Sequence, residues 1–223
     1  MMIDMKAAKE ILRLQNELNT GTAGKDWKSG MTDKGRKIDW QLCVAMETAE
    51  LIDSLNWKHW KDIDAPDDIE NAKMELVDIL HFLASWALEN RVEDEFEAIL
   101  STHWADWTES KESTVSVCKE LLAIASSDDK YRFKDAMACF KDLLSIFEFE
   151  DEIYSIYLGK NVLNKFRQDH GYKDGSYVKL WDGEEDNAFM TATLKEVTPS
   201  AEELYTILQT KYDEVTGSSD AIS

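Results

Sequence analysis

The sequence contains few of the residues that interrupt helices. Its 223 residues include two prolines and nine glycines, and six of these glycines fall within residues 21–35 and 171–175. Long segments without either residue separate the two stretches, and strand-like alternation of polar and apolar residues is scarce. We therefore predict an all-α fold, a helical bundle formed by a single domain over residues 1–223.

Cysteine is also scarce, and long apolar runs are missing. The three cysteines, Cys43, Cys118 and Cys139, form no CxxC pair, so we expect buried free thiols in a reducing compartment. A transmembrane helix needs a run of about 18 apolar residues, which the sequence lacks. Residues 1–10 carry charges where a signal peptide needs an apolar core. Cytoplasmic residence is the resulting expectation.

Positive charge is in short supply. The chain has 25 Lys and Arg against 45 Asp and Glu, a formal net charge of −20 at pH 7. This balance argues against general nucleic-acid binding, because a polyanion needs a basic surface. A small phosphorylated substrate needs only local cations, and a bound divalent metal can supply them. We therefore expect a small-molecule partner and neither nucleic acid nor membrane.

Apolar residues at helical spacing outline the expected helices. Asp39 can cap a helix that ends near residue 55, and the segment Pro66-Asp67-Asp68 opens another that reaches residue 90. Residues 92–151 are harder to place and are interpreted as a variable insertion or mobile segment. The other expected elements are helices over 5–18, 132–147, 150–168 and 201–214, loops over 20–37 and 170–187, and a frayed tail over 216–223.

Two pairs of acidic residues lie at the i, i+3 spacing of a helix. They are Glu47 with Glu50, and Glu75 with Asp78. Residues at this spacing share a helix face, and both pairs lie among apolar residues, where unpaired carboxylates are costly. If the two helices pack antiparallel, four oxygen ligands converge, which suits Mg²⁺ or Mn²⁺. The alternative is that all four are surface charges, because a chain with 45 acidic residues contains such pairs by chance.

One segment departs from the acidity of the chain. Residues 160–179 carry five basic side chains against two acidic ones, together with amides, hydroxyls and glycines that allow close approach of a ligand. Such a segment fits the binding of a triphosphate. The alternative is an ordinary solvated loop that contains lysines by chance.

Four motifs stand in order along the chain: LQNELN at 14–19, METAELIDSLNWKHWK at 46–61, ELVDILHF at 75–82 and GKNVLNKFRQDHGYKDGSYVKLWDGEEDN at 159–187. Together they resemble the dimeric dUTPases, all-α nucleoside triphosphate pyrophosphatases distinct from the trimeric, β-rich dUTPases. The carboxylate pairs alone would indicate only the wider superfamily with its MazG-like members. The resemblance implies a bundle of the all-α NTP pyrophosphatase type, a metal site between helices, and a homodimer.

The resemblance also implies roles for individual residues. The four carboxylates take the metal-binding positions, and one of Glu47 and Glu50, with Glu50 favoured, orients or deprotonates the attacking water. Gln15 and Asn19 take the positions that read the uracil edge, since a side-chain amide offers both a donor and an acceptor. The other positions line the base (Trp57, Phe82), contact the deoxyribose (His81, Asn161) or hold phosphates (Lys58, Lys160, Arg167, Lys173, Tyr177, Lys179).

The reaction implied is Mg²⁺-dependent hydrolysis of dUTP, and also of dUDP, to dUMP, with water attacking the β-phosphorus. Taken singly, Gln15 and Asn19 fit the polar face of a helix, Trp57 and Phe82 fit core residues, and His81 fits a structural histidine. The order of the motifs favours the site. A MazG-like pyrophosphatase of another nucleotide would share the carboxylates but not the two amides. A non-enzymatic acidic protein with a basic partner fits the charge of −20 but leaves the cationic segment unexplained.

Overall fold

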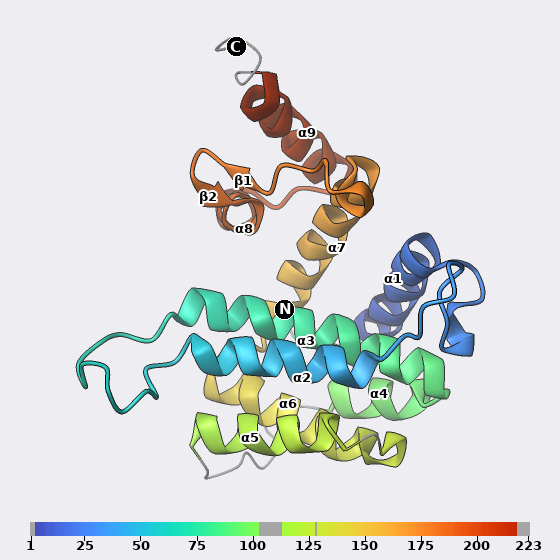
Figure 1. Ribbon diagram of the computed structural model, residues 1–223, viewed down its shortest axis with the longest axis vertical. Helices are drawn as coiled ribbons and strands as arrows, with labels where there is room; N and C mark the ends of the chain where they lie inside the picture. Colours follow the sequence, from blue (N-terminus) through green and yellow to red (C-terminus); the bar gives the residue numbers. More distant parts are fainter. Residues whose placement is uncertain (1–2, 103–112, 128, 218–223) are drawn as a thin grey trace. The chain divides into compact units, whose positions relative to one another are not determined.

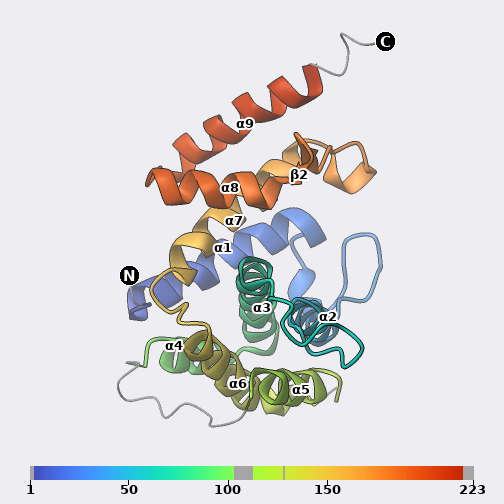
Figure 2. The ribbon, with the colours of Figure 1, turned by 90° about the vertical axis from the view of Figure 1, so that its left-hand side faces the viewer.

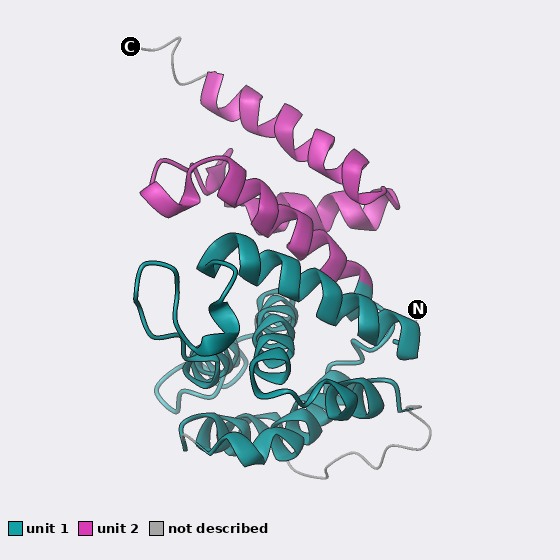
Figure 3. Cartoon of the chain, turned by 90° about the vertical axis from the view of Figure 1, so that its right-hand side faces the viewer, with its two compact units in different colours: residues 1–154 teal, residues 155–223 magenta. Residues whose placement is uncertain are grey.

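The computed structural model describes residues 3–102, 113–127 and 129–217. The chain divides into two compact units, unit 1 (residues 1–154) and unit 2 (residues 155–223) (Figure 3). Regular structure in the described ranges is helical apart from a short hairpin and an isolated bridge, so the all-α prediction is confirmed. None of the helices in these ranges has the length and apolarity needed to cross a membrane.

Two long helices that lie side by side form the centre of unit 1, α2 (Trp40–Asp53) and α3 (Ile69–Asn90) (Figure 1). They run antiparallel, because Trp40 at the start of α2 stacks on Phe82 in the second half of α3. Helix α5 packs on α2, and α6 packs on both α5 and α3 (Figure 2). The surrounding helices are α1 (Met5–Ala23), α4 (Glu93–Leu100), α5 (Thr114–Ala125) and α6 (Phe133–Ile146).

Aspartate side chains fix where the two central helices begin. The Asp39 carboxylate accepts a hydrogen bond from the backbone N–H of Leu42 (3.0 Å), and that of Asp68 accepts one from Asn71 (3.1 Å). Each bond satisfies a backbone donor that has no partner within its own helix. The cap at Asp39, the start of α3 directly after residues 66–68 and its end at Asn90 agree with the sequence-based predictions.

The first helix extends beyond its predicted range and takes in part of the predicted loop. It continues to Ala23 and stops at Gly24, whose φ of 101° is rarely adopted by residues with a side chain. The remaining loop contains a 3-10 helix, Trp27–Ser29, that contacts α3, and the side chain of Trp27 is buried. The loop is therefore packed against the core of unit 1.

Residues 92–151, interpreted from the sequence as an insertion or mobile segment, contribute α4, α5 and α6 to unit 1. Phe96, Leu121 and Phe140 from these helices are fully buried. Residues 103–112 lie outside the described residues. The described part of this segment is therefore packed within unit 1.

A buried lysine joins two of these helices. Lys141 of α6 is 1% exposed, and its Nζ donates to the carbonyl oxygens of Ile99 (2.9 Å) and Thr102 (2.6 Å) at the end of α4. Carbonyls at a helix C-terminus lack partners within the helix and attract cations. Burial nevertheless disfavours the charged amine and lowers the pKa of Lys141 to about 8.

The three cysteines are free, as predicted. Cys118 and Cys139 are buried, and burial raises the pKa of each thiol to about 12. Because the thiolate is the reactive form, both side chains behave as small apolar core residues.

Unit 2 has an aromatic core. It comprises most of α7 (Ile153–Asp169) together with α8 (Asp186–Glu196) and α9 (Ala201–Gly217). Phe166 of α7 is fully buried and packs against rings from later segments. These rings belong to Tyr177, Trp181, Tyr205 and Tyr212.

The segment predicted as a loop over residues 170–187 contains a hairpin instead. Strands β1 (Leu180–Trp181) and β2 (Glu184–Glu185) pair antiparallel. Asp182 and Gly183 between them have φ values of 52° and 94°, as a two-residue type I′ turn requires. Helix α8, which follows directly, is absent from the predicted elements. Of the predicted tail, residues 216 and 217 end α9, and residues 218–223 lie outside the described part.

Candidate functional site

Three of the four predicted metal ligands lie together between α2 and α3. Carboxylate oxygens of Glu47, Glu75 and Asp78 lie within 4.8 Å of one another. Glu47 extends from α2 and the other two from α3, as the antiparallel packing allows. Glu75 is 7% exposed, whereas Glu47 and Asp78 are half-buried. Glu50 is exposed and lies outside this close group.

The crowding of these carboxylates changes their acidity. Burial, followed by the charges of Asp78, Glu75 and Glu50, raises the pKa of Glu47 to about 8. Negative charge is therefore so concentrated that one carboxyl keeps its proton near neutral pH. A divalent cation among the oxygens would offset this repulsion, and a set of hard oxygen donors suits such an ion. The donor set thus fits a divalent metal site.

Asn71 orients one member of the group. Its Nδ2 donates to Oε1 of Glu75 (3.0 Å) and to Oγ of Ser54 (2.8 Å), the residue that follows α2. An amide N–H can only donate, so the contact fixes the direction of one carboxylate oxygen of Glu75. Partners of this kind commonly fix the direction of metal ligands.

The two amides predicted to read a base belong to a buried hydrogen-bond chain between α1 and α3. Gln15 and Asn19 are each 2% exposed, so the alternative of a polar outer face is wrong. Gln15 Nε2 donates to Asn19 Oδ1 (2.9 Å), and Gln15 Oε1 lies 2.7 Å from Nδ1 of His81. Asn19 Nδ2 donates to Oγ of Ser85 (3.0 Å). The structure thus brings three predicted residues together and adds Ser85.

Phe82 and Trp57, predicted to line the base, have different surroundings. Phe82 stacks on Trp40 with ring centroids 6.1 Å apart, and Trp40 lines a cavity of about 520 Å³. Trp57 is 46% exposed in the connector between α2 and α3, where its ring lies 6.3 Å from that of Trp60. The alternative of a core residue is therefore wrong for Trp57. Its neighbour Lys58, predicted to hold phosphate, forms an ion pair with Asp53.

Predicted phosphate-binding residues of unit 2 form a polar network within that unit. Arg167 Nε and Nη2 donate to the two carboxylate oxygens of Asp186 (2.8 and 2.6 Å), and both residues are buried. The Tyr177 hydroxyl donates to the same carboxylate (2.7 Å). Lys160, which is 3% exposed, donates to Oδ1 of Asn187 (3.1 Å), and Arg167 Nη2 donates to the same oxygen (3.2 Å). These contacts tie α7 to the start of α8.

The other predicted residues of unit 2 are two exposed lysines and one half-buried asparagine. Lys179 is exposed and forms an ion pair with Glu185 (3.0 Å), and Lys173 is exposed in a 3-10 helix. Asn161 is half-buried, and its buried Nδ2 has no hydrogen-bond partner among the described residues. Buried donors without partners are uncommon, so the Nδ2 of Asn161 is a polar group whose hydrogen bond is not satisfied by the described residues.

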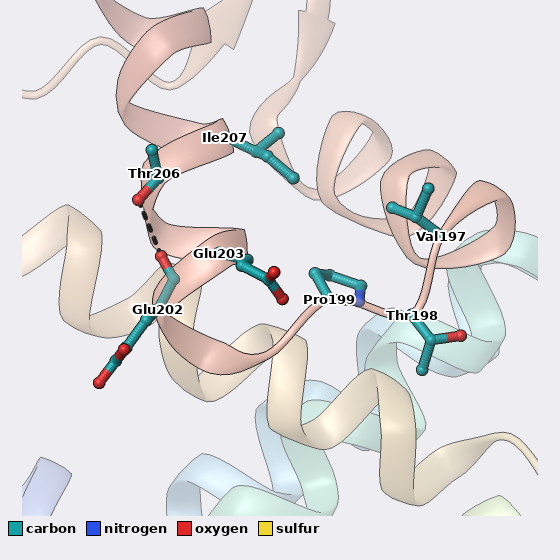
Figure 4. A pocket seen from close by; sticks show the side chains of 7 residues that line it. All are labelled: Val197, Thr198, Pro199, Glu202, Glu203, Thr206 and Ile207. Atoms are coloured by element: carbon teal, nitrogen blue, oxygen red, sulfur yellow. Dashed lines mark hydrogen bonds between the residues drawn. The ribbon is translucent and has the colours of Figure 1, made fainter.

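A groove of about 560 Å³ in unit 2 contains none of the predicted site residues (Figure 4). Its two acidic side chains would repel a phosphate, and its apolar side chains offer no polar recognition. The lining residues are Val197, Thr198, Pro199, Glu202, Glu203, Thr206 and Ile207.

Three residues that contact predicted residues within their own unit are absent from the sequence-based predictions: Asn71 and Ser85 in unit 1 and Asp186 in unit 2. Asn71 and Ser85 each lie four residues from a predicted residue on α3, a spacing that places them on the same helix face. That spacing could have identified them. Asp186 stands within the fourth motif, but its pairing with Arg167 spans 19 residues and has no local signal.

A family model described as dUTPase matches residues 7–172. The match includes both amides, all four carboxylates, His81 and Phe82, whereas Lys173, Tyr177 and Lys179 lie beyond it. A search of curated proteins finds no match to the chain. Since the matched range covers well over half of the 223 residues and an all-α fold surrounds the carboxylate group, the chain belongs to the dUTPase family of dUTP-hydrolysing enzymes.

Proposed function

We propose that this dUTPase converts both dUTP and dUDP to dUMP, releasing pyrophosphate or phosphate, and that it requires Mg²⁺, with Mn²⁺ as a substitute. The observation that carries the proposal is the group of three carboxylate side chains whose oxygens lie within 4.8 Å of one another. Mg²⁺ at such a site would neutralise phosphate charge and lower the pKa of a bound water. Glu47, Glu75 and Asp78 hold the metal, and Glu50 completes the set.

We assign the attacking water to Glu50, with Glu47 in support. Glu50 follows Glu47 by one helical turn and is exposed, so its carboxylate is accessible to water and substrate. This carboxylate orients the water and accepts its proton. The water oxygen forms a bond to the β-phosphorus of dUTP, the bond from that phosphorus to the bridging oxygen breaks, and dUMP leaves with the bridging oxygen.

Uracil recognition is assigned to Gln15 and Asn19, whose burial supports a specific role. In a site that excludes water, a donor or acceptor without a partner costs free energy. A base whose hydrogen-bonding edge does not complement the two amides is therefore bound more weakly. Phe82 and Trp57 supply apolar surface to the base. His81 and Asn161 are assigned to the deoxyribose, and the buried Nδ2 of Asn161 without a partner among the described residues supports this assignment.

The phosphates are assigned to cationic and hydroxyl groups, which would stabilise the charge of the leaving group. Lys173 and Lys179 are exposed and accessible to a ligand. Arg167 and Tyr177 are held by Asp186, so they would offer a fixed surface to phosphate. The full set is Lys58, Lys160, Arg167, Lys173, Tyr177 and Lys179.

We also propose that the enzyme is a homodimer. Leu42 and Met46 lie one turn apart on α2 and are 56% and 51% exposed, and neighbouring large apolar groups on a surface support an interface. Light scattering should give the mass of a dimer for the wild type. A mass of 25.6 kDa, that of one chain, would contradict the proposal.

Release of pyrophosphate and phosphate from dUTP, dUDP, dCTP and TTP, with and without Mg²⁺, tests the proposed reaction. We expect release from the two deoxyuridine nucleotides alone, and only with the metal. Glu75→Gln should be inactive, whereas Glu70→Gln, an exposed position on the same helix, should retain activity. A preference for another nucleotide, as in a MazG-like enzyme, would overturn the uracil assignment. Turnover in excess chelator would overturn the metal requirement.

A further inference from the structure

The connector between α2 and α3, residues 54–68, has little buried surface. It projects beyond the ends of the two helices (Figure 1), none of residues 56–68 is buried, and the side chains of Trp57 and Trp60 are 46% and 67% exposed. Apolar burial therefore contributes little to the shape of this segment, which depends on its hydrogen bonds instead. The connector nevertheless carries two residues assigned to the substrate, Trp57 and Lys58.

The side chain of Asn56 closes part of the connector into a ring. Its Nδ2 donates to the carbonyl oxygens of Asp62 (2.9 Å) and Ile63 (3.3 Å), six and seven residues further along the chain. Trp57 and Lys58 lie between the two ends of this ring. Two hydrogen bonds from one amide thus set the path of the backbone that carries both residues.

The orientation of the Asn56 amide follows from its partners. A backbone carbonyl can only accept, so the amide nitrogen must face both of them. If the amide turned over, Oδ1 would face two carbonyl oxygens and both bonds would be lost. In the observed orientation Oδ1 is buried without a hydrogen-bond partner among the described residues, so no competing bond in that part of the chain favours the reverse.

The backbone of Asn56 also contacts the far end of the connector. Its N–H donates to Oδ1 of Asp67 (2.5 Å), and next to it the N–H of Asp68 donates to the carbonyl oxygen of Ser54 (2.8 Å). The two ends of the connector are therefore joined to each other, whereas the Asn56 side chain alone ties its middle to its start.

Other contacts of Trp57 and Lys58 do not replace this closure. Trp57 packs against Trp60, with ring centroids 6.3 Å apart, and the Lys58 ammonium lies 5.9 Å from the Trp57 ring. All three residues belong to the ring and would move with it. Lys58 also pairs with Asp53 of α2, but the side chain of Asp53 is 66% exposed, and solvent weakens such a pair.

We infer that Asn56 is a positioning residue that holds the connector in the conformation that presents Trp57 to the base and Lys58 to the phosphates. The inference rests on the substrate roles proposed for those two residues. Without the two hydrogen bonds the connector opens, and the apparent affinity for dUTP falls with the fraction of molecules that remain closed. The closed molecules turn over as before, so kcat is unchanged.

Steady-state kinetics with dUTP at saturating Mg²⁺ compare wild type, Asn56→Ala and Asn56→Asp. We expect Asn56→Ala to raise KM about tenfold, the factor that corresponds to about 1.4 kcal/mol, and to leave kcat unchanged. Aspartate has nearly the same size but offers no N–H to the two carbonyls, so Asn56→Asp should raise KM at least as much. A wild-type KM in both variants would overturn the inference, as would a loss confined to kcat.

Trypsin measures the opening of the connector without substrate. It cleaves after lysine, and Lys58 and Lys61 both lie within the ring. We expect Asn56→Ala to be cleaved at these two sites about tenfold faster than wild type, because cleavage follows the population of the open segment. The urea midpoint should stay near that of wild type, since the opening is local. Cleavage at the wild-type rate, or faster cleavage only together with a general loss of stability, would overturn the inference.

Asn90→Ala serves as the matched control. Nδ2 of Asn90 also donates to a backbone carbonyl, that of Trp86 (3.2 Å), but at the opposite end of α3 from the connector. This variant should keep the wild-type KM and the wild-type rate of cleavage after Lys58. Changes as large as those of Asn56→Ala would overturn the role of Asn56.

Two further variants, Trp57→Ala and Lys58→Ala, separate this inference from the proposed function. If neither variant raises KM for dUTP, the substrate roles proposed for the two residues fail. If either variant raises it and Asn56→Ala keeps the wild-type KM, the role of Asn56 alone fails.

Discussion

Replacing Glu47 with Gln should stabilise the metal-free protein and at the same time abolish its response to Mg²⁺. Glu47, Glu75 and Asp78 place three carboxylates within 4.8 Å, and their repulsion together with burial raises the pKa of Glu47 to about 8. A glutamine has nearly the same shape and no charge. The substitution therefore removes a negative charge that a proton or a bound cation must offset in the wild type.

The size of the effect follows from the geometry. Two unit charges 4.8 Å apart repel by about 3.5 kcal/mol at an effective dielectric constant near 20. Glu47 is half-buried, so solvent screens much of this and we expect a gain of about 1–2 kcal/mol. The raised pKa means that the folded state binds a proton more tightly than the unfolded state. Wild-type stability should accordingly fall as pH rises from about 4.3 to 8, and the variant should lack this slope.

Urea unfolding at pH 7.5, with chelator and with saturating Mg²⁺, measures both effects. Wild type should gain about 2.7 kcal/mol at a metal concentration 100 times its Kd. Without metal, the Glu47→Gln variant should have a higher free energy of unfolding than wild type, and Mg²⁺ should raise that free energy only slightly. Glu50→Gln, at an exposed position outside the close group, should change the metal-free stability by less than about 0.5 kcal/mol. A metal-free Glu47→Gln protein less stable than wild type would refute the reasoning.

Three further predictions follow from individual contacts. Asn71→Ala should weaken Mg²⁺ binding about tenfold in calorimetry, because Glu75 loses its orienting donor; an unchanged affinity would show that the contact is incidental. Asp186→Asn should lower the free energy of urea unfolding by about 3–5 kcal/mol, since Arg167 stays buried without its charge partner, and a loss below about 1 kcal/mol would contradict this. The lowered pKa of Lys141 means that the folded state binds fewer protons than the unfolded state between pH 8 and about 10.4, so wild-type stability should rise across that window. Relative to wild type, Lys141→Met should therefore lose about 2–3 kcal/mol between pH 7 and pH 10, and a pH-independent difference would count against the burial argument.

The features that could be predicted from the sequence are those with a local cause. Asp39 is recognisable as a helix cap because a cap depends on a few adjacent residues. The i, i+3 spacing likewise brings the carboxylates of Glu75 and Asp78 together. The spacing does not determine which member of a pair faces the neighbouring helix, and Glu50 is exposed and lies outside the close group.

Two kinds of feature were not predicted. Some depend on contacts between residues far apart in the sequence, and others lie in a segment whose composition is typical of a loop. The burial of Gln15 and Asn19 depends on α3, which lies more than 50 residues further along the chain. The hairpin and α8 follow a segment rich in glycine, aspartate and lysine, whose composition indicates a loop. The pairing of Arg167 with Asp186 and the packing of rings on Phe166, which join residues far apart in the sequence, help to hold it in place.

The aromatic core of unit 2 bears on how the chain can be shortened. The family match ends at residue 172, yet Phe166 packs against rings from residues 177 to 212, and the charge partner of Arg167 stands at position 186. A truncation after residue 172 would expose the side chain of Phe166 and remove the counter-ion of Arg167. The chain should therefore not be truncated where the family match ends, and a shortened version of the protein must retain α8 and α9.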